Sequence, residues 1–567
     1  MEDEERSQNE QKNASRFTRD ASQKIAAAFL SGILLFLSFP PFEFFPLAWL
    51  APAPLIYICF VSKPAESFSC GLLAGAVFWL AGIFWLAKVS FFGWIFVALY
   101  CSLYFAVFAA IVSWWRGTFK IFNIQHSASD FERRDLCSKL SDSGGKVQRW
   151  MLEVFGVYMI LLFGIPAVWV ALEYVRTRIL TGFPWNLLGV SQHACLPLIQ
   201  CADWGGVYLV SYLIAMANAA VVLLVFNRGK GVLQAAGIIV PFVLIISLVL
   251  GYGLRRLEAG RAGGPVDKIR TASVQLNVPQ QYKWSENWAE DIYRRLKKSA
   301  AAAGRPAPPG LIVWPETALP DFLRYGEASR AAANETLRHG VPLLAGSMDY
   351  EMLSGKTNYY NSSFLFIPGD EPPQVYIKRH LVICGEYVPL ARFFPFLRSI
   401  TGIEEDFTPG AETVVFRLKE KGRAFAVLIC FEDIFPCLAR AAVLAGARLL
   451  INQTNDAWFD PSWASRQHMV HCVFRCVENR VACLRAANTG VTCYIDRFGF
   501  IRSALKPAGA GVYEPQIMRC EAEFEAENMP LSFYTRHGDL FALACLAFTL
   551  PLLLAALLNA IGLRKKN

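Results

Sequence analysis

The segment Ala424-Phe-Ala-Val-Leu-Ile-Cys-Phe-Glu-Asp-Ile-Phe-Pro436 joins an apolar run to a cysteine and two acidic residues. The apolar run predicts a buried strand, and Glu432 and Asp433 suit the first turn of a helix that follows it. Cys430 would then face the positive end of the helix dipole, which favours the thiolate and makes a better nucleophile. A lone cysteine at such a place is more often a small core residue, so its role depends on the rest of the chain.

The composition indicates a membrane protein with more than one domain. The chain has 567 residues, of which 54% are hydrophobic and 18% charged. This balance is typical of membrane proteins when the apolar residues lie in long blocks. The net charge of +9 comes without interleaved aromatic and basic residues, so we expect no nucleic-acid partner. The fifteen cysteines are scattered along the chain, which does not indicate a disulfide framework.

Long intervals without Asp, Glu, Lys or Arg predict eight transmembrane helices, because a span needs ~20 apolar residues. The interval 179–202 is also free of charge, but it contains helix breakers and polar residues such as Pro184, Gln192 and His193. We interpret it as an interfacial or re-entrant loop, which must be shielded by protein at membrane depth. The eight predicted spans are 25–42, 44–62, 67–87, 89–115, 154–172, 204–227, 231–254 and 540–563.

Basic residues indicate how these spans are oriented. The hydrophilic insertion 116–150, the connection that contains Arg228 and Lys230, and the end of the chain are all basic. If they share one side of the membrane, the positive-inside rule makes that side cytoplasmic and returns both termini to it. Arg176 and Arg178 would lie on the opposite side, in minor conflict with the rule.

The spans divide the chain into segments with different predicted surroundings. The residues before the first span are polar and mixed in charge, which predicts a disordered leader followed by a retained anchor. The large polar segment after the seventh span would lie outside the cytoplasm, which in a bacterium is the periplasm. The predicted multi-pass inner-membrane protein has a cytoplasmic leader at 1–24, a membrane domain at 25–254 with a cytoplasmic insertion at 116–150, a periplasmic domain at 255–539, a final span at 540–563 and a basic cytoplasmic tail at 564–567.

The segment 255–539 has the pattern of an α/β domain. Short β-rich runs alternate with helical stretches, which predicts parallel strands with helices that cover the sheet. The predicted helices are Glu286–Ala303, Ala328–His339 and Ser465–Arg480. The predicted strands are Thr271–Val274, Leu311–Val313, Leu343–Ala345, Ser363–Ile367, Ala424–Ile429, Leu449–Asn452 and Val491–Ile495.

Two further segments of this domain place ionisable residues among apolar ones. In Leu311-Ile-Val-Trp-Pro-Glu316 an apolar strand ends just before a carboxylate, where ligands bind in α/β sheets. Removal from water suits Glu316 to act as a general base. Lys378 and Glu386 lie among apolar and aromatic residues, where a lysine can stabilise an oxyanion. Each signal alone also fits a loop acid or a surface lysine, but with Cys430 they supply a base, an ammonium and a nucleophile.

The residues Trp314-Pro-Glu316, Lys378 and Cys430-Phe-Glu432 resemble the Glu-Lys-Cys triad of the nitrilase, or carbon–nitrogen hydrolase, superfamily. The resemblance implies an α-β-β-α sandwich. Within that superfamily, the chain is similar to the apolipoprotein N-acyltransferase family, whose order of seven spans, a nitrilase-like domain and one final span it shares. The stretches that carry this likeness are Lys378-Arg-His-Leu-Val382, Gly385-Glu-Tyr-Val-Pro-Leu390, Asn455-Asp-Ala-Trp-Phe459, Gln467-His468, Arg485-Ala-Ala-Asn-Thr-Gly490 and Thr181-Gly-Phe-Pro-Trp185.

The resemblance implies a reaction and its partners. Glu316 would be the general base, Lys378 the oxyanion stabiliser and Cys430 the nucleophile that accepts an acyl group. The enzyme would transfer the acyl chain of a phospholipid, through a thioester, to the α-amine of the N-terminal diacylglyceryl-cysteine of an apolipoprotein. Both substrates are anchored in the bilayer, and the reaction would need no cofactor and no metal.

Four more residues take supporting roles from the same resemblance. Glu386 resembles a second essential glutamate of the family, and Glu432 resembles the glutamate that follows the nucleophile. Trp284, in Gln281-Tyr-Lys-Trp284, resembles a tryptophan on a mobile arm over the active site. Phe431 stands where the family often has tyrosine, so any role of that hydroxyl would be lost here.

Other functions remain open at this point. A membrane-tethered amidase would use the same triad with water as the acceptor. A transporter or assembly scaffold is disfavoured, because the eight predicted spans contain no charged residue that would line a transport path. The helical spacing of His468, His471, Cys472 and Cys476 fits helix packing better than a metal site, since no second ligand cluster accompanies it.

Overall fold

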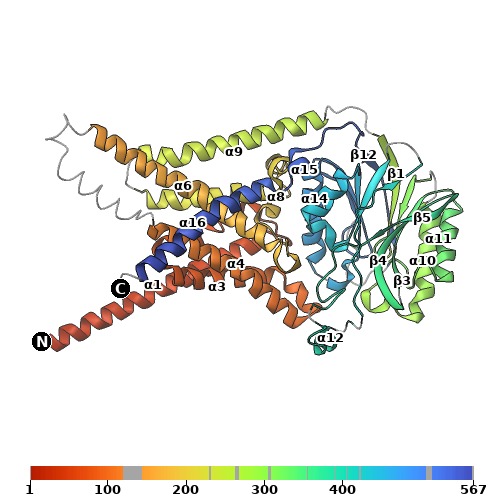
Figure 1. The fold of residues 1–567 in the computed structure, drawn as a ribbon, viewed down its shortest axis with the longest axis horizontal. Coiled ribbons are helices and arrows are strands. Elements are labelled where there is room, and N and C mark those ends of the chain that lie inside the picture. The colour runs from red at the N-terminus through yellow and green to blue at the C-terminus, as the bar shows by residue number, and fades with distance from the viewer. Residues whose placement is uncertain are drawn as a thin grey trace.

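The computed structural model divides the chain into a bundle of long helices and an α/β domain (Figure 1). We call these parts the helical half, up to residue 261 and again from 540, and the α/β domain, between 267 and 537. The structure describes residues 2–118, 144–228, 232–261, 267–303, 308–353, 355–389, 391–401, 403, 405–419, 423–460, 462–505 and 514–564. Most of the predicted insertion 116–150 lies outside these residues.

Six helices of the helical half are long and apolar enough to cross a membrane, within the described residues. Their qualifying stretches are Asp20–Leu37, Pro64–Gly82, Phe91–Arg116, Gly156–Arg176, Ala202–Phe226 and Gln234–Gly260. Two further apolar stretches, Phe45–Val61 and Leu540–Leu554, are shorter. The helices are α1 (Glu2–Leu37), α2 (Ala53–Val61), α3 (Pro64–Gly82), α4 (Phe91–Thr118), α6 (Gly144–Arg176), α8 (Ala202–Phe226), α9 (Val232–Arg261) and α16 (Leu540–Arg564).

The first two predicted spans differ from the structure. The leader at 1–24 was expected to be disordered, but α1 begins at Glu2 and continues into the first span. The interval 44–62 was expected to be one helix, but it contains the 3₁₀ helix η1 (Phe45–Trp49) and the nine-residue α2. Pro52 separates them because it has no N–H to continue a helix and fits before a new one.

The predicted loop 179–202 has no long helix in the structure, as expected. It is built from the short turns η3 (Ile179–Thr181), η4 (Leu188–Gln192) and α7 (Leu196–Ile199). Its polar side chains Gln192 and Gln200 are completely buried in protein. The loop therefore meets the requirement that irregular backbone at membrane depth be shielded from lipid.

The α/β domain contains two six-stranded sheets. Their central strands are parallel, such as β1–β2–β3 and β7–β8–β9, while antiparallel strands complete the edges. The first sheet has the order β12 (Gln516–Phe524), β1 (Asp267–Gln275), β2 (Leu311–Val313), β3 (Leu343–Leu353), β4 (Lys356–Ile367), β5 (Asp370–Ile377). The second has the order β11 (Ile501–Ala504), β10 (Cys493–Ile495), β9 (Ala482–Ala487), β8 (Leu449–Thr454), β7 (Ala424–Ile429), β6 (Phe416–Arg417).

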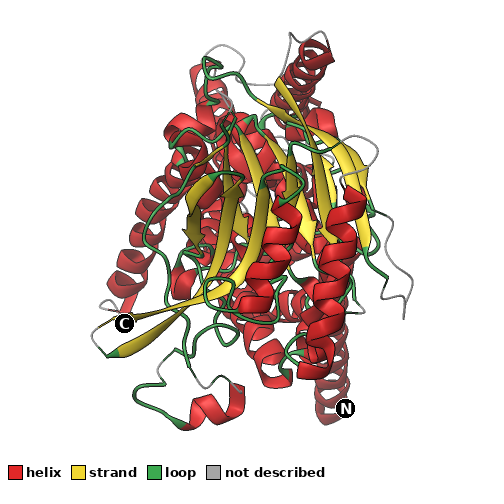
Figure 2. Cartoon of the chain, turned by 90° about the vertical axis from the view of Figure 1, so that its right-hand side faces the viewer, coloured by secondary structure: helices red, strands yellow, loops and turns green. Residues whose placement is uncertain are grey.

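Helices cover the outer faces of the two sheets and complete an α-β-β-α sandwich, as predicted. Val427 and Ile429 of β7 face the first sheet, whereas Ala426 and Leu428 face the helices, because side chains alternate along a strand. Helices also lie in front of the strands when the domain is viewed from the side opposite the helical half (Figure 2). The outer helices are α10 (Glu286–Ala303) and α11 (Glu327–Leu337) on the first sheet, and α13 (Pro436–Leu444) and α14 (Ala464–Asn479) on the second.

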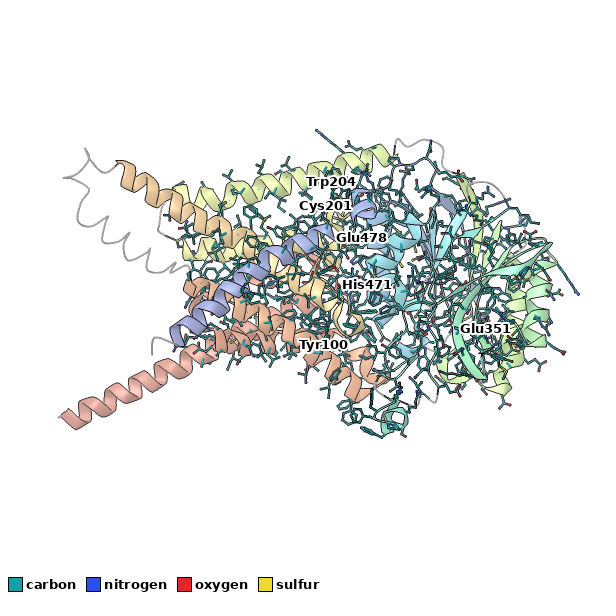
Figure 3. All side chains as sticks on the ribbon, viewed as in Figure 1. Tyr100, Cys201, Trp204, Glu351, His471 and Glu478 are labelled. Atoms are coloured by element: carbon teal, nitrogen blue, oxygen red, sulfur yellow. The ribbon has the colours of Figure 1, made fainter. Side chains whose placement is uncertain are left out.

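The helical half packs directly on α13 and α14. Side chains of these two helices share one continuous hydrophobic core with the membrane helices. Figure 3 places His471 and Glu478 of α14 at this junction, and the Glu478 carboxylate accepts a hydrogen bond from the backbone N–H of Val207 at 3.0 Å. Shorter elements are η2 (Phe84–Lys88), η5 (Gln280–Tyr282), α12 (Phe396–Thr401), η6 (Cys430–Ile434), η7 (Asp456–Phe459) and α15 (Phe533–His537).

Candidate active site

The three residues of the predicted triad lie just beyond the carboxyl ends of three strands. Glu316 follows β2, Lys378 follows β5 directly, and Cys430 follows β7. The pattern changes at these points: Pro315 follows the buried β2, the charged Lys378 follows the half-exposed β5, and the left-handed Cys430 follows the buried β7. The sandwich thus brings together side chains that are up to 114 positions apart in the chain, which is the distance from 316 to 430.

Lys378 is buried between two carboxylates. Its Nζ lies 2.7 Å from Oε1 of Glu386 and 3.5 Å from Oε1 of Glu316. Burial alone would lower the pKa of Lys378, but the Glu386 and Glu316 carboxylates outweigh burial and raise it. The lysine is therefore held as an ammonium next to the site where an oxyanion would form.

Asn361, which the sequence analysis missed, connects the same two carboxylates. Its side-chain N–H group donates to Oε1 of Glu316 at 2.8 Å and to Oε1 of Glu386 at 3.0 Å. The other oxygen of Glu386 accepts from the backbone N–H of Val382 at 2.8 Å. A polar residue in the buried strand β4 is the only sequence signal for this role, and buried strands contain such residues for many reasons.

Cys430 has a left-handed backbone, with φ +52°, and this conformation is strained for a residue with a Cβ. The structure contradicts the expectation that a helix dipole favours its thiolate. A 3₁₀ turn, η6, follows Cys430, and α13 begins only at Pro436. Burial raises the pKa of the Cys430 thiol well above its ordinary value, the Glu316 carboxylate raises it further, and Lys378 opposes them. The resting thiol is therefore protonated and needs a base.

Glu432 fixes the cysteine turn to the loop that carries Lys378. Its completely buried carboxylate accepts hydrogen bonds from the backbone N–H groups of Ile429 at 2.8 Å, Arg379 at 2.7 Å and His380 at 3.1 Å. The hydroxyl of Tyr376 also donates to it at 2.9 Å. Glu432 therefore holds the cysteine turn and the Lys378 loop in a fixed position relative to each other.

A buried charged network behind Cys430 was also missed. His468 contacts Oδ1 of Asp433 at 2.7 Å, Oδ1 of Asp456 at 2.9 Å and the carbonyl oxygen of Cys430 at 3.2 Å. Arg485 donates to the other oxygen of each aspartate at 2.9 Å. Burial alone would lower the pKa of His468, but Asp433 and Asp456 raise it to about 9 although Arg485 opposes them. Two cations thus face two carboxylates, and the charges balance.

Phe431 and Trp284 lie at the edge of the site. The Phe431 ring stacks on Trp185 of the loop 179–202, with ring centroids 6.5 Å apart. Trp284 is 46% exposed, whereas its neighbour Lys283 is only 2% exposed. The Lys283 ammonium donates to the carbonyl oxygen of Glu316 at 3.2 Å, which places a second lysine beside the predicted base.

The helical half contains a cavity that is partly open to the outside. Its walls are mainly aromatic and aliphatic side chains of α1, α3, α4 and α6, including Trp79. Arg176 in its wall donates to the carbonyl oxygens of Phe183 at 2.7 Å and Trp185 at 2.9 Å. Phe183 stacks on Trp185, which stacks on Phe431. A continuous series of aromatic rings therefore connects this cavity to the cysteine turn.

Comparisons with known proteins agree with this architecture. The apolipoprotein N-acyltransferase N-terminal domain matches residues 31–220, and the carbon-nitrogen hydrolase family matches residues 270–518. The apolipoprotein N-acyltransferase of Geobacter metallireducens is 37% identical over 558 residues, covering 95% of both chains. That of Chlorobaculum tepidum is 28% identical over 554 residues, covering 93% of this chain and 95% of the relative. A Saccharomyces cerevisiae nitrilase-superfamily structure covers 48% of this chain and 95% of its own, with 20% identity and a TM-score of 0.32.

The sandwich of two sheets and the matching residues 270–518 define a carbon–nitrogen hydrolase domain, here attached to a bundle of apolar helices. The relatives match both parts in the same order and over almost the whole length. The chain belongs to the apolipoprotein N-acyltransferase family.

Proposed function

We propose that this protein is a membrane-bound acyltransferase that works in two steps through a thioester on Cys430. The observation that carries the proposal is the convergence of Glu316, Lys378 and Cys430 at three strand ends, on the side where the α/β domain approaches the helical half. The family of the chain supplies the substrates, which are a phospholipid donor and a diacylglyceryl-apolipoprotein acceptor.

In the first step, Glu316 takes the proton of the Cys430 thiol, and the sulfur attacks the carbonyl carbon of a phospholipid acyl ester. The Lys378 ammonium stabilises the oxyanion that forms on the carbonyl oxygen. When the C–O bond breaks, Glu316 returns its proton to the departing oxygen, and a lysophospholipid leaves. This role of Glu316 fits the raised pKa of Cys430, because a thiol that stays protonated in the resting site requires a base.

In the second step, the α-amine of the diacylglyceryl-cysteine attacks the thioester carbonyl. Lys378 again stabilises the oxyanion, and Glu316 accepts the proton that the amine loses and passes it to the Cys430 sulfur as the C–S bond breaks. The product is an N-acylated, triacylated lipoprotein. Glu386 and Glu432 support the step by holding Lys378 and the cysteine turn, and the exposed Trp284 covers the site when substrate binds.

The aromatic cavity of the helical half supports a lipid substrate. It is lined mainly by apolar side chains, and its rings lead toward Phe431 next to the nucleophile. An acyl chain that enters from the bilayer would lie in this cavity, with its ester at Cys430. Water as the final acceptor would make the protein an amidase instead, and the mass of the product separates the two reactions.

We also propose eight spans and a periplasmic α/β domain in the bacterial inner membrane. The shorter apolar helices α2 and α16 would complete the six long ones. The start of α1 and the end of α16 lie at the same end of the bundle, away from the α/β domain (Figure 1), which suits two cytoplasmic termini. The two arginines opposed to the positive-inside rule have structural partners, since Arg176 binds backbone carbonyls and Arg178 pairs with Asp539.

The test is to incubate the full-length protein in detergent with phosphatidylethanolamine alone and to analyse it by intact-protein and peptide mass spectrometry. We expect an acyl adduct on Cys430 and an equimolar lysophospholipid, and no adduct on Cys430→Ala. A diacylglyceryl-peptide added next should become acylated as the adduct disappears. An absent adduct in the wild type, or an equal adduct in Cys430→Ala, would contradict the thioester route, and free fatty acid without acylated peptide would indicate a hydrolase.

A further inference from the structure

Lys283 points into the protein between two exposed aromatic residues. It follows η5, between β1 and α10, and is 2% exposed, whereas Tyr282 and Trp284 on either side are 36% and 46% exposed. A lysine is costly to bury, so an inward lysine flanked by exposed aromatic residues needs partners that compensate its charge. The sequence analysis singled out Trp284 on this segment, yet the side chain that reaches the site is the lysine.

The partners of Lys283 belong to the loop of the base. Its Nζ donates to the backbone carbonyl oxygen of Glu316 at 3.2 Å and to the hydroxyl oxygen of Thr317 at 2.6 Å. Thr317 has a left-handed backbone, with φ +42°, so these bonds hold a strained turn directly after the base. Among the described residues, no carboxylate oxygen lies within 4.0 Å of this ammonium.

The charges around Cys430 explain why a second cation is needed there. Two carboxylates, Glu316 and Glu386, face the single ammonium of Lys378, which leaves an excess of negative charge. Such an excess opposes a thiolate at Cys430. Burial lowers the pKa of Lys283 to about 8, and the negative charges of Glu316 and, once it is deprotonated, Cys430 oppose this effect.

We propose that Lys283 is a positioning residue of the acyl-transfer site, which holds the Glu316–Thr317 turn and adds a second positive charge beside Cys430. The role of Lys283 in acyl transfer rests on the proposed function. Its effect on the pKa of Cys430 concerns the free thiol and does not depend on that function. The same contacts fix the segment that carries Trp284, so the exposed ring is attached next to the base by its buried neighbour.

The charge of Lys283 gives the proposal a pH dependence. The groups that face it are Glu316 on the β2 loop and Cys430 on η6, with Lys378 beyond them on the β5 loop. An ammonium is present below its pKa and lost above it, so Lys283 supports the site below about pH 8 and ceases to do so as the pH rises. Thioester formation by the wild type should therefore decline on the alkaline side, and Lys283→Arg should extend activity to higher pH.

The direct test is alkylation of Cys430 by iodoacetamide in the full-length protein, followed by peptide mass spectrometry. This reaction reports the thiolate and needs no acyl donor, so it stands apart from the thioester experiment. Loss of a nearby positive charge raises the pKa of a thiol, so Lys283→Met should slow alkylation roughly threefold to tenfold near neutral pH. Lys283→Arg should restore most of the rate, and Lys297→Met, on the exposed side of α10, should leave it unchanged.

The outcomes separate this inference from the proposed function. A folded Lys283→Met variant with the wild-type alkylation rate would overturn the role of Lys283, even if the wild type forms the thioester. If the wild type forms no thioester but Lys283→Met is alkylated more slowly than the wild type, the proposed function is overturned. The role of Lys283 as a second positive charge beside Cys430 is then retained. If Lys283→Met does not fold, Thr317→Ala keeps the ammonium but removes one of its acceptors. It should slow alkylation about threefold, since roughly one hydrogen bond is lost, and an unchanged rate would contradict the proposal.

Discussion

At the scale of single residues, the site is organised by buried charges whose partners come from other segments. Lys378 is an ammonium because two carboxylates contact it, and His468 is charged for the same reason. Cys430 stays a thiol, because burial and the Glu316 carboxylate outweigh the positive charge of Lys378. The ionisation state of each group therefore follows from the neighbours that the two sheets bring to it, not from its position in the sequence.

His468 gives a prediction for stability against pH. Its folded pKa of about 9 lies above the ordinary value of 6.5, so its contribution is complete below about pH 6.5 and is lost as the pH rises through 9. Wild-type melting temperature should fall over this window by several degrees more than that of His468→Gln. Circular dichroism in detergent between about pH 6 and 10 measures the difference. Parallel curves for the two proteins would show that His468 is neutral in the folded state.

The three triad positions could be predicted because strand ends next to ionisable residues are visible in the sequence. Asn361 and Lys283 could not, since their roles depend on contacts with Glu316, 45 and 33 positions away along the chain. The same holds for Arg485, which reaches Asp433 across 52 positions. The dipole argument for Cys430 was wrong because it assumed an α-helix and ignored the depth at which the thiol is buried.

At the scale of elements, α14 is the connection between the two halves. Gln467 on this helix uses its complete hydrogen-bonding capacity across the junction. Its Oε1 accepts from the indole N–H groups of Trp85 at 3.0 Å and Trp185 at 2.9 Å. Its Nε2 donates to the carbonyl oxygens of Pro40 at 2.9 Å and Gly82 at 3.0 Å. One side chain thus joins α14 to three segments of the helical half.

Gln467→Leu should destabilise the protein and weaken the stacking of Trp185 near the site. The exchange leaves buried donors and acceptors without partners, at a cost of about 1–3 kcal/mol each. We expect the melting temperature in detergent to fall by at least about 3 °C. Arg466→Leu is the matched control, because its pairing with Glu43 is 56% exposed on the arginine side, and surface pairs contribute only about 0–1 kcal/mol. Equal effects of the two variants would contradict the role given to Gln467.

Elements with a strong apolar or amphipathic pattern could be predicted better than half-exposed edge strands. The predicted helix Glu286–Ala303 and strands Leu311–Val313 and Ala424–Ile429 coincide with α10, β2 and β7. The edge strands β5, β6, β11 and β12 were missed because they are half-exposed or interrupted by polar residues, so their apolar pattern is weak. Whether an antiparallel strand joins the edge of a parallel sheet depends on its pairing with a strand that is distant in the sequence. The local sequence pattern does not encode this pairing.

At the scale of the whole molecule, the two halves are one packed unit. The outer helices of the second sheet share their hydrophobic core with the membrane helices. Buried ion pairs cross the same junction, since Arg480 of the α/β domain binds Asp203 of α8 at 2.6 Å. The face of the α/β domain that is formed by α13 and α14 is therefore buried against the helical half in the intact protein.

The isolated segment 255–539 should therefore aggregate or remain partly unfolded when it is produced alone. Its α13 and α14 would expose apolar side chains such as Val443 and Val473, together with the unpaired charge of Arg480. Size-exclusion chromatography and thermal unfolding of the segment measure this directly. Co-production with the helical half should restore a soluble complex in detergent, and a monomeric, cooperatively folding segment would show that the junction is dispensable.

The depth of Cys430 also affects how readily its sulfur is oxidised. The thiolate, rather than the thiol, attacks peroxides and disulfides. Because burial and Glu316 keep the sulfur protonated at rest, it is a poor target for oxidation between reaction cycles. In the proposed mechanism the nucleophile becomes reactive when Glu316 removes its proton with an acyl ester in place, so the same buried thiol would provide both resistance to oxidation and activation by substrate.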